Sequence, residues 1–141
     1  MKIEMLLCGA MLAMLSLNAQ ATEDTGAPNQ AATEAPVPGE VSFKLDVQPI
    51  LRDYCVSCHE PGGKGYVKSG LDLTSYQGTM KGTKFGAVVI PGNSEASTFT
   101  KLLTGTNNGL KMPMGLNSSG TLDRQYILVL RKWVRQGAKN N

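Results

Sequence analysis

The sequence predicts an all-α domain of about three to four helices connected by glycine-rich loops. Apolar residues recur at helical spacing in three segments, and glycines are concentrated between those segments. The chain has 16 glycines among its 141 residues. Because the folded part comprises only about a hundred residues, its apolar core is modest in size. We therefore expect a bulky ligand to complete the core.

The first 21 residues have the features of a secretory signal peptide. Met1-Lys2 gives a positively charged start, the apolar run Met5–Leu17 carries no charge, and Ala19-Gln20-Ala21 supplies small residues for cleavage. We expect cleavage after Ala21 and export to a bacterial periplasm or to the outside of the cell. No transmembrane anchor is expected to remain after cleavage.

Residues 22–41 form an acidic segment rich in proline and alanine. It contains four acids and no bases or aromatic residues, so it cannot bury enough apolar surface to fold. This composition predicts a flexible tether, followed by a folded domain at residues 42–139. Of the 14 Lys and Arg and the 11 Asp and Glu in the chain, 13 and 6 fall in residues 42–141, giving this part a net charge of +7. The charge favours acidic partner proteins, and the absence of a known nucleic-acid motif argues against nucleic acid.

The first predicted helix precedes the cysteines. Its apolar stripe follows helical spacing and consists of Phe43, Val47, Ile50, Leu51 and Tyr54. Asp46 is expected to cap this helix, with Pro49 in its first turn. The helix is expected to run straight into Cys55.

Two further helices are predicted in the second half of the chain. One starts near Asn93 or Ser94 and ends at Gly105, and the other starts at Thr121 and ends at Gly137. The last helix carries Leu122, Tyr126, Leu130, Trp133 and Val134 on one face. Between the first helix and these two, Pro61–Gly65 is expected to be a loop and Leu73–Met80 a further short helix.

The stretch Cys55-Val56-Ser57-Cys58-His59 contains all the cysteine and histidine residues of the predicted domain. A structural zinc site needs four ligands, but the domain has no other cysteine or histidine. A thioredoxin-like dithiol would lie in a βαβ pattern, which is absent. A local Cys55–Cys58 disulfide would leave the adjoining histidine without a role.

The remaining interpretation is covalent haem attachment, which the spacing C-x-x-C-H indicates. Two thiols can add across the two vinyl groups of one porphyrin, and the next residue can present its imidazole to the iron. A helix beginning near Cys55 would make this arrangement rigid. The motif therefore predicts one haem c, with Cys55 and Cys58 as thioether sites and His59 as an iron ligand.

A second axial ligand must be sought among sulfur donors, because His59 is the only histidine. Met80 lies in an amphipathic segment and is expected to pack in the core. Pro113 favours an extended conformation at Met112, so Met112 and Met114 should point to opposite sides. The residues alone leave Met112 and Met114 as alternative candidates for the second iron ligand. A third possibility is that both methionines only line the haem pocket.

Four ordered segments resemble the planctomycete-type cytochrome c domain family of monohaem c-type cytochromes. They are FKLDVQPILRDYCVSCHEPGGKGYVKSGLDLTSYQGTMKG, VVIPGNSEASTFTKLL, KMPMG and LDRQYILVLRKWVRQGA. The resemblance covers nearly all of Phe43–Ala138. It implies a cytochrome c-like fold, in which the first and last helices cross and one covalently bound haem lies between them.

The resemblance also implies the roles of individual residues. Cys55 and Cys58 correspond to the thioether sites and His59 to the proximal ligand. The family's Met-Pro dipeptide falls on Met112-Pro113, which favours Met112 as the distal ligand over Met114, where a second proline is common.

Other side chains are expected to support this site. Tyr126 and Trp133 are expected as core contacts at the helix crossing. Loop lysines around the haem are candidates for docking a partner or binding the haem propionates, and these are Lys64, Lys68, Lys81, Lys84 and Lys111.

The predicted function is an exported electron carrier that transfers single electrons between redox partner proteins and is not an enzyme. Two alternatives remain open. One is a haem sensor or peroxidase-like protein with a labile or open sixth iron position. The other is the cytochrome subunit of a larger oxidoreductase.

Overall fold

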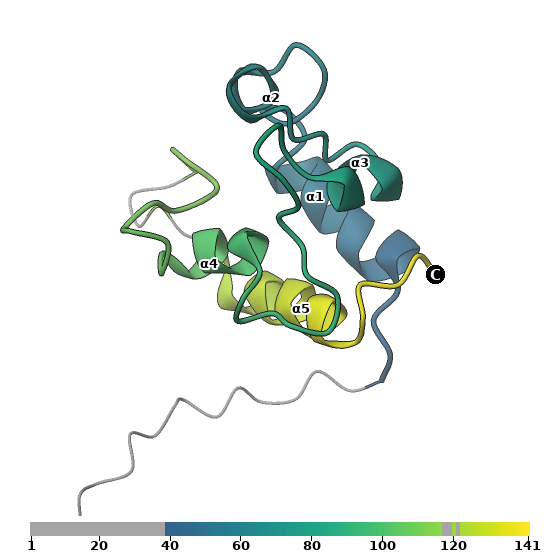
Figure 1. The fold of residues 1–141 in the computed structure, drawn as a ribbon. Coiled ribbons are helices and arrows are strands. Elements are labelled where there is room, and N and C mark those ends of the chain that lie inside the picture. The colour runs from purple at the N-terminus through teal and green to yellow at the C-terminus, as the bar shows by residue number, and fades with distance from the viewer. Residues whose placement is uncertain (1–38, 117–119, 121) are drawn as a thin grey trace, which may run out of the picture. The chain divides into compact units, whose positions relative to one another are not determined.

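The helices of the domain are short and surround a single apolar core (Figure 1). The computed structural model describes residues 39–116, 120 and 122–141. Within these ranges the regular secondary structure is helical, and only Thr83–Gly86 and Asn107–Leu110 form isolated bridges. The all-α fold predicted from the sequence is confirmed.

The first helix consists of η1 (Phe43–Val47), which has π-helical bonding, followed directly by α1 (Gln48–Tyr54). It starts earlier than predicted, because Ser42 and not Asp46 is the N-cap. The Ser42 hydroxyl accepts a hydrogen bond from the Leu45 N–H (3.2 Å), and the Asp46 carboxylate accepts one from the Ser42 N–H (2.8 Å). The two side chains therefore cap the helix reciprocally.

Pro49 consequently lies at the start of α1 and not in the first turn of the whole helix. A proline inside a helix cannot donate a hydrogen bond and its ring crowds the preceding turn. The wider π-turn directly before it, with the Val47 N–H bonded to the Ser42 carbonyl (3.2 Å), provides the local adjustment commonly found at such a position.

Two short helices follow the cysteine–histidine motif. Helix α2 (Lys64–Ser69) includes the end of the segment Pro61–Gly65, which was predicted to be a loop throughout. Helix α3 (Tyr76–Lys81) confirms the predicted short helix, with Ser75 as its N-cap. Met80 in α3 is partly buried and packs against the core, as expected.

Helix α4 (Thr98–Thr104) begins later than predicted. Asn93 does accept a hydrogen bond through its side chain, from the Ala96 N–H (2.9 Å), but it closes a separate turn. The Ser97 hydroxyl bonds the Asn93 carbonyl (2.8 Å), and the backbone of Ser97 is extended. The predicted end at Gly105 is correct, and this glycine adopts the left-handed conformation that terminates helices.

Helix α5 (Arg124–Arg135) is the longest described helix, and Asp123 caps it through the Gln125 N–H (2.9 Å). The predicted cap Thr121 lies outside the described residues. The predicted apolar face is largely buried, and Leu130, Trp133 and Val134 are inaccessible to solvent.

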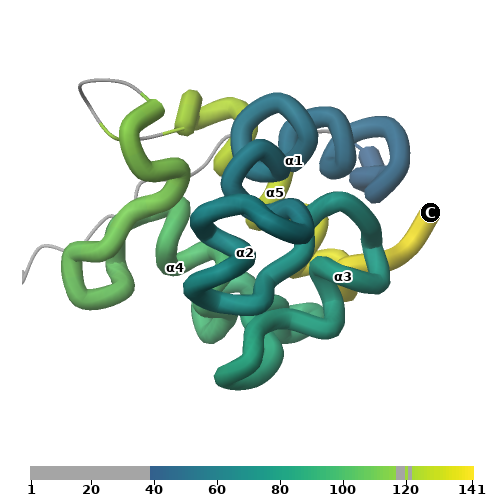
Figure 2. Tube along the Cα trace, turned by 90° about the horizontal axis from the view of Figure 1, so that it is seen from above, coloured from purple at the N-terminus to yellow at the C-terminus, as the bar shows by residue number. Residues whose placement is uncertain are grey.

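The crossing of the first and last helices organises the core. Helix α5 packs against both η1 and α4, and Figure 2 shows α5 running beneath α1. At the crossing, the Phe43 ring lies 5.5 Å from the Trp133 ring and 5.2 Å from the Tyr76 ring. Trp133 is therefore the core contact that the sequence predicted.

Hydrogen bonds join the first residues of the domain to its last residues. The Asn141 side chain accepts a bond from the Phe43 N–H (2.9 Å), and its carbonyl accepts one from the Lys44 N–H (3.0 Å). The Gln136 side chain accepts a bond from the Val41 N–H (2.9 Å). All described residues fall in one compact unit, Glu34–Asn141.

The predicted signal peptide and all but the last residues of the predicted tether lie outside the described residues. Among the residues that are described, no helix is long and apolar enough to cross a membrane.

Replacement of Ser42 by alanine should destabilise the domain by about 1–2 kcal/mol, the usual cost of losing an N-cap. The change removes the hydroxyl that binds the Leu45 N–H and also donates to the Asn141 carbonyl (2.7 Å). Urea unfolding followed by circular dichroism measures the effect. Ser42→Thr, which keeps the hydroxyl, is the control, and equal stability of the two variants would contradict the capping role.

Candidate functional site

The cysteine–histidine motif forms one tight turn at the end of α1. Cys55 closes the helix through a bond from its N–H to the Leu51 carbonyl (2.8 Å). The Cys55 carbonyl then accepts bonds from the Cys58 N–H (3.2 Å) and the His59 N–H (3.0 Å). The expectation that a helix begins near Cys55 is therefore wrong: a helix ends there and a turn follows.

Backbone hydrogen bonds hold this turn from two further segments. The Tyr66 N–H in α2 donates to the Cys58 carbonyl (2.9 Å), and the Leu73 N–H donates to the His59 carbonyl (2.8 Å). Helix α2 comes very close at its N-terminal end, because a Cβ placed on Gly63 would lie 2.5 Å from the Cys58 oxygen. Only glycine permits this approach, so the turn is clamped by main-chain contacts.

The His59 side chain is half-buried, and its Nδ1 atom has no hydrogen-bond partner. Burial lowers the pKa of His59 below its usual value, and the Leu71 carbonyl opposes this shift only in part. The imidazole is therefore held in the neutral form, which is the form that binds a metal ion.

The two thiols differ in their surroundings. Cys58 is exposed, whereas the Cys55 thiol is largely enclosed, and both are free. Burial, with a smaller contribution from Cys58, raises the pKa of Cys55 to about 12. At neutral pH Cys55 is thus a neutral thiol in apolar surroundings, unsuited to act as a thiolate ligand of a metal ion.

These features fit covalent haem better than a metal ion held by protein ligands alone. No three His, Cys, Asp or Glu side chains converge on a metal position among the described residues. A neutral imidazole and two free thiols three residues apart instead match the requirements of a porphyrin that forms two thioethers. Cys55, Cys58 and His59 would hold it.

The methionine candidates lie in the loop between α4 and α5. The Met112 side chain is half-buried, and its N–H donates to the Leu102 carbonyl of α4 (2.9 Å). Met114 is 66% exposed. The loop also partly exposes Leu110 and Leu116, so its described part presents apolar side chains at the surface.

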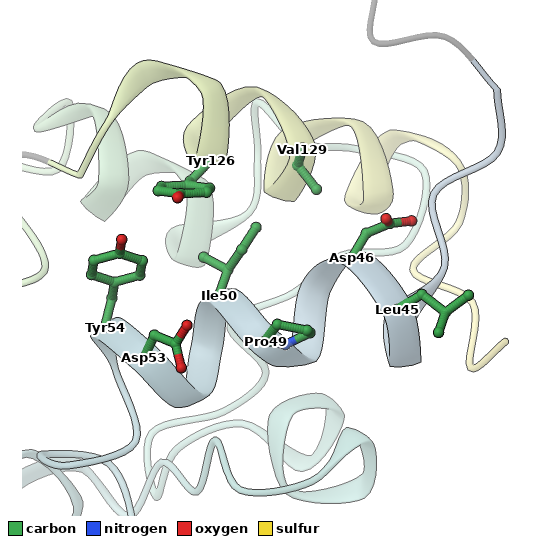
Figure 3. A pocket seen from close by; sticks show the side chains of 8 residues that line it. All are labelled: Leu45, Asp46, Pro49, Ile50, Asp53, Tyr54, Tyr126 and Val129. Carbon is green, nitrogen blue, oxygen red and sulfur yellow. The ribbon is translucent and has the colours of Figure 1, made fainter.

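Tyr126, the second predicted core contact, is partly buried and pairs with Tyr54 at a ring distance of 5.2 Å. A hydrogen bond with Tyr126 raises the pKa of Tyr54, with burial as a smaller cause. The tyrosine rings lie at one end of a pocket of about 330 Å³ between the first helix and α5 (Figure 3). Its lining residues come from Leu45–Tyr54, Tyr126 and Val129 and include none of the motif residues.

The five candidate lysines are all exposed. Lys64 and Lys68 belong to α2 and Lys81 ends α3, so these three lie on short helices and not in loops as expected. Lys84 lies over the ring of Phe85 (5.2 Å to the centroid).

The sequence did not reveal how His59 is enclosed. Helix α2 and the segment around Leu71 supply its contacts, and α2 was not predicted. One available signal was Gly70, which ends α2 in the left-handed conformation. The glycines of the preceding segment were a second signal, because they permit close backbone contact.

Comparison with known proteins gives one match. Residues 55–113 match the sequence model of the family described as planctomycete cytochrome c. The match runs from the first cysteine of the motif to Pro113 and is shorter than the resemblance found in the sequence. No curated protein and no solved structure gives a significant match. The match suggests a haem-binding electron carrier with covalently bound haem, and the two cysteines that this requires are present. Residues 55–113 of the chain are thus similar to the planctomycete cytochrome c family.

Proposed function

We propose that this protein is an exported monohaem c-type cytochrome that transfers single electrons between redox partner proteins. The observation that carries the proposal is the clamped turn Cys55–His59, which presents two free thiols and a neutral imidazole within the segment that matches the cytochrome c family model. When bound, the haem supplies an iron that cycles between the ferric and ferrous states.

The chain's own residues have three tasks in this function. Cys55 and Cys58 fix the porphyrin covalently, and His59 binds the iron from the same turn. The hydrogen bonds from Tyr66 and Leu73 to the turn restrict its movement. A ligand set that does not rearrange between oxidation states keeps the barrier to electron transfer low.

We assign the distal position to Met112 and not to Met114. Its side chain is half-buried and its backbone is tied to α4, whereas the Met114 side chain is mostly exposed. A thioether ligand opposite histidine raises the reduction potential of the haem. Met114 is then free to cover the edge of the site or to face solvent.

Export and acidic partners complete the proposal. Residues 1–21 have the signal-peptide pattern, and covalent haem attachment of this type is expected outside the cytoplasm. The excess of basic residues in the domain would steer an acidic partner protein towards it. A firm His/Met pair favours this carrier over a sensor or a peroxidase-like protein.

An optical spectrum of the protein exported with haem-maturation machinery should show a low-spin c-type haem in both oxidation states. A methionine–iron charge-transfer band is expected in the ferric form, and added CO should leave the ferrous spectrum unchanged because the sixth position is occupied. A high-spin spectrum or rapid CO binding would instead indicate a sensor or peroxidase. Absence of haem would refute both functions.

Replacement of Met112 by alanine should remove the charge-transfer band, open the iron to CO and lower the potential by a sizeable part of the roughly 0.8 V range that axial ligands span. Met114→Ala is the matched control and should change none of the three. Voltammetry and CO titration provide the measurements. The opposite pattern would assign the distal position to Met114.

Replacement of Cys58 by serine should leave the haem attached through Cys55 alone. The unreacted vinyl group stays conjugated with the porphyrin, so the pyridine haemochrome band should move to longer wavelength, and mass spectrometry should still find one haem per chain. Cys55→Ser should give the same result. An unshifted haemochrome band in either variant would show that its cysteine does not form a thioether.

A further inference from the structure

Helix α2 lies against the imidazole of His59 at a residue without a side chain. A Cβ placed on Gly65 would lie 2.7 Å from the His59 Cε1 atom and 2.8 Å from its Nε2 atom. Both distances are shorter than real Cβ contacts allow. Helix α2 thus packs closely against the Cε1–Nε2 side of the ring at Gly65, with no room for a side chain between them.

This side of the His59 ring carries Nε2, the nitrogen that would bind the iron. Nδ1 is buried within the protein, which leaves Nε2 as the nitrogen available to the iron. A methyl group on residue 65 would occupy the space beside Nε2. It would turn the ring, push α2 away, or crowd the metal position.

Helix α2 has little freedom to retreat from such a group. The Tyr66 N–H donates to the Cys58 carbonyl (2.9 Å), and the Ser69 hydroxyl donates to the Gly65 carbonyl (2.7 Å). Gly63 is also in close contact with the Cys58 carbonyl. A displacement of α2 would therefore break contacts that fix the haem motif itself.

The backbone of Gly65 does not require glycine. Its φ is not in the positive range, and the residue lies inside a helix, where glycine is less favourable than alanine. Conformation therefore does not explain this glycine, whereas the contact with His59 does.

We propose that Gly65 is a positioning residue for iron ligation: the absence of a side chain lets α2 pack against the His59 ring and hold its orientation without placing a methyl group beside Nε2. This inference rests on the proposed function, because it concerns the imidazole as an iron ligand. It assigns to α2 a role in setting the haem's properties, in addition to packing.

The variant Gly65→Ala tests the proposal, with Gly78→Ala as a matched control. Gly78 lies in α3, its φ is not positive, and a Cβ there would lie 2.6 Å from the Asp72 carbonyl oxygen, with no atom of the His59 ring among its three nearest contacts. Both variants insert one methyl group into a tight helix contact. Both should lower stability, but only Gly65→Ala should alter the ligation of the iron.

The readouts are the ferric electron paramagnetic resonance spectrum and the reduction potential of the purified holoproteins. We expect Gly65→Ala to lose the low-spin ferric signal of the wild type, wholly or in part, and to shift the potential. Gly78→Ala should keep both. Wild-type values in Gly65→Ala would overturn the inference and leave the proposed function intact, whereas a wild type without haem would overturn both.

A measurement on the wild type covers the case in which Gly65→Ala yields no holoprotein. In the diamagnetic ferrous protein, the Gly65 Hα protons should show a nuclear Overhauser effect to the His59 Hε1 proton, because the space for a side chain at residue 65 is closed by the Cε1 atom of the ring. If that effect is present, loss of holoprotein in Gly65→Ala but not in Gly78→Ala supports the proposal. If the effect is absent, the proposal is wrong.

Discussion

The close approach of α2 to the turn Cys58–His59 is the constraint on which the site depends. Gly63 leaves no room for a side chain beside the Cys58 carbonyl, and Gly65 leaves none beside the imidazole. The Tyr66 N–H can reach the Cys58 carbonyl only because the backbones come this close. The clamp therefore relies on the absence of side chains, so that larger residues at these two positions would disturb the motif without touching a cysteine or histidine.

The turn that α2 clamps is attached to the crossing of the first helix with α5. Phe43 and Trp133 fix the crossing, and the Trp133 indole N–H also donates to the Lys139 carbonyl (2.9 Å). Helix α1 leads from the crossing directly to Cys55, so the motif is attached to the most buried part of the molecule. The helices are otherwise too short to be stable alone, since isolated helices below about 12 residues are marginal. Packing and caps hold them in place.

The sequence predicted the fold class and the position of the main helices, because apolar spacing is a local signal. It was less successful where contacts between distant segments decide the structure. Ser42 replaced Asp46 as the cap because the helix starts a turn earlier, and Asn93 closes a turn that the backbone of Ser97 interrupts. Helix α2 was not predicted, because it is stabilised by its contacts with the turn Cys58–His59 and not by a pattern in its own sequence. Three of its six residues are Lys or Gly, and no apolar stripe marks it.

The two sides of the candidate site are built differently, and this difference bears on function. The histidine side is held by hydrogen bonds from two segments and by glycine contacts, whereas the described part of the methionine loop is tied to α4 through the Met112 N–H and exposes several apolar side chains. A firmly held proximal side would fix how a haem is attached. The described part of the distal loop has fewer such restraints, so a methionine–iron bond there would depend largely on apolar contacts between the haem and the loop.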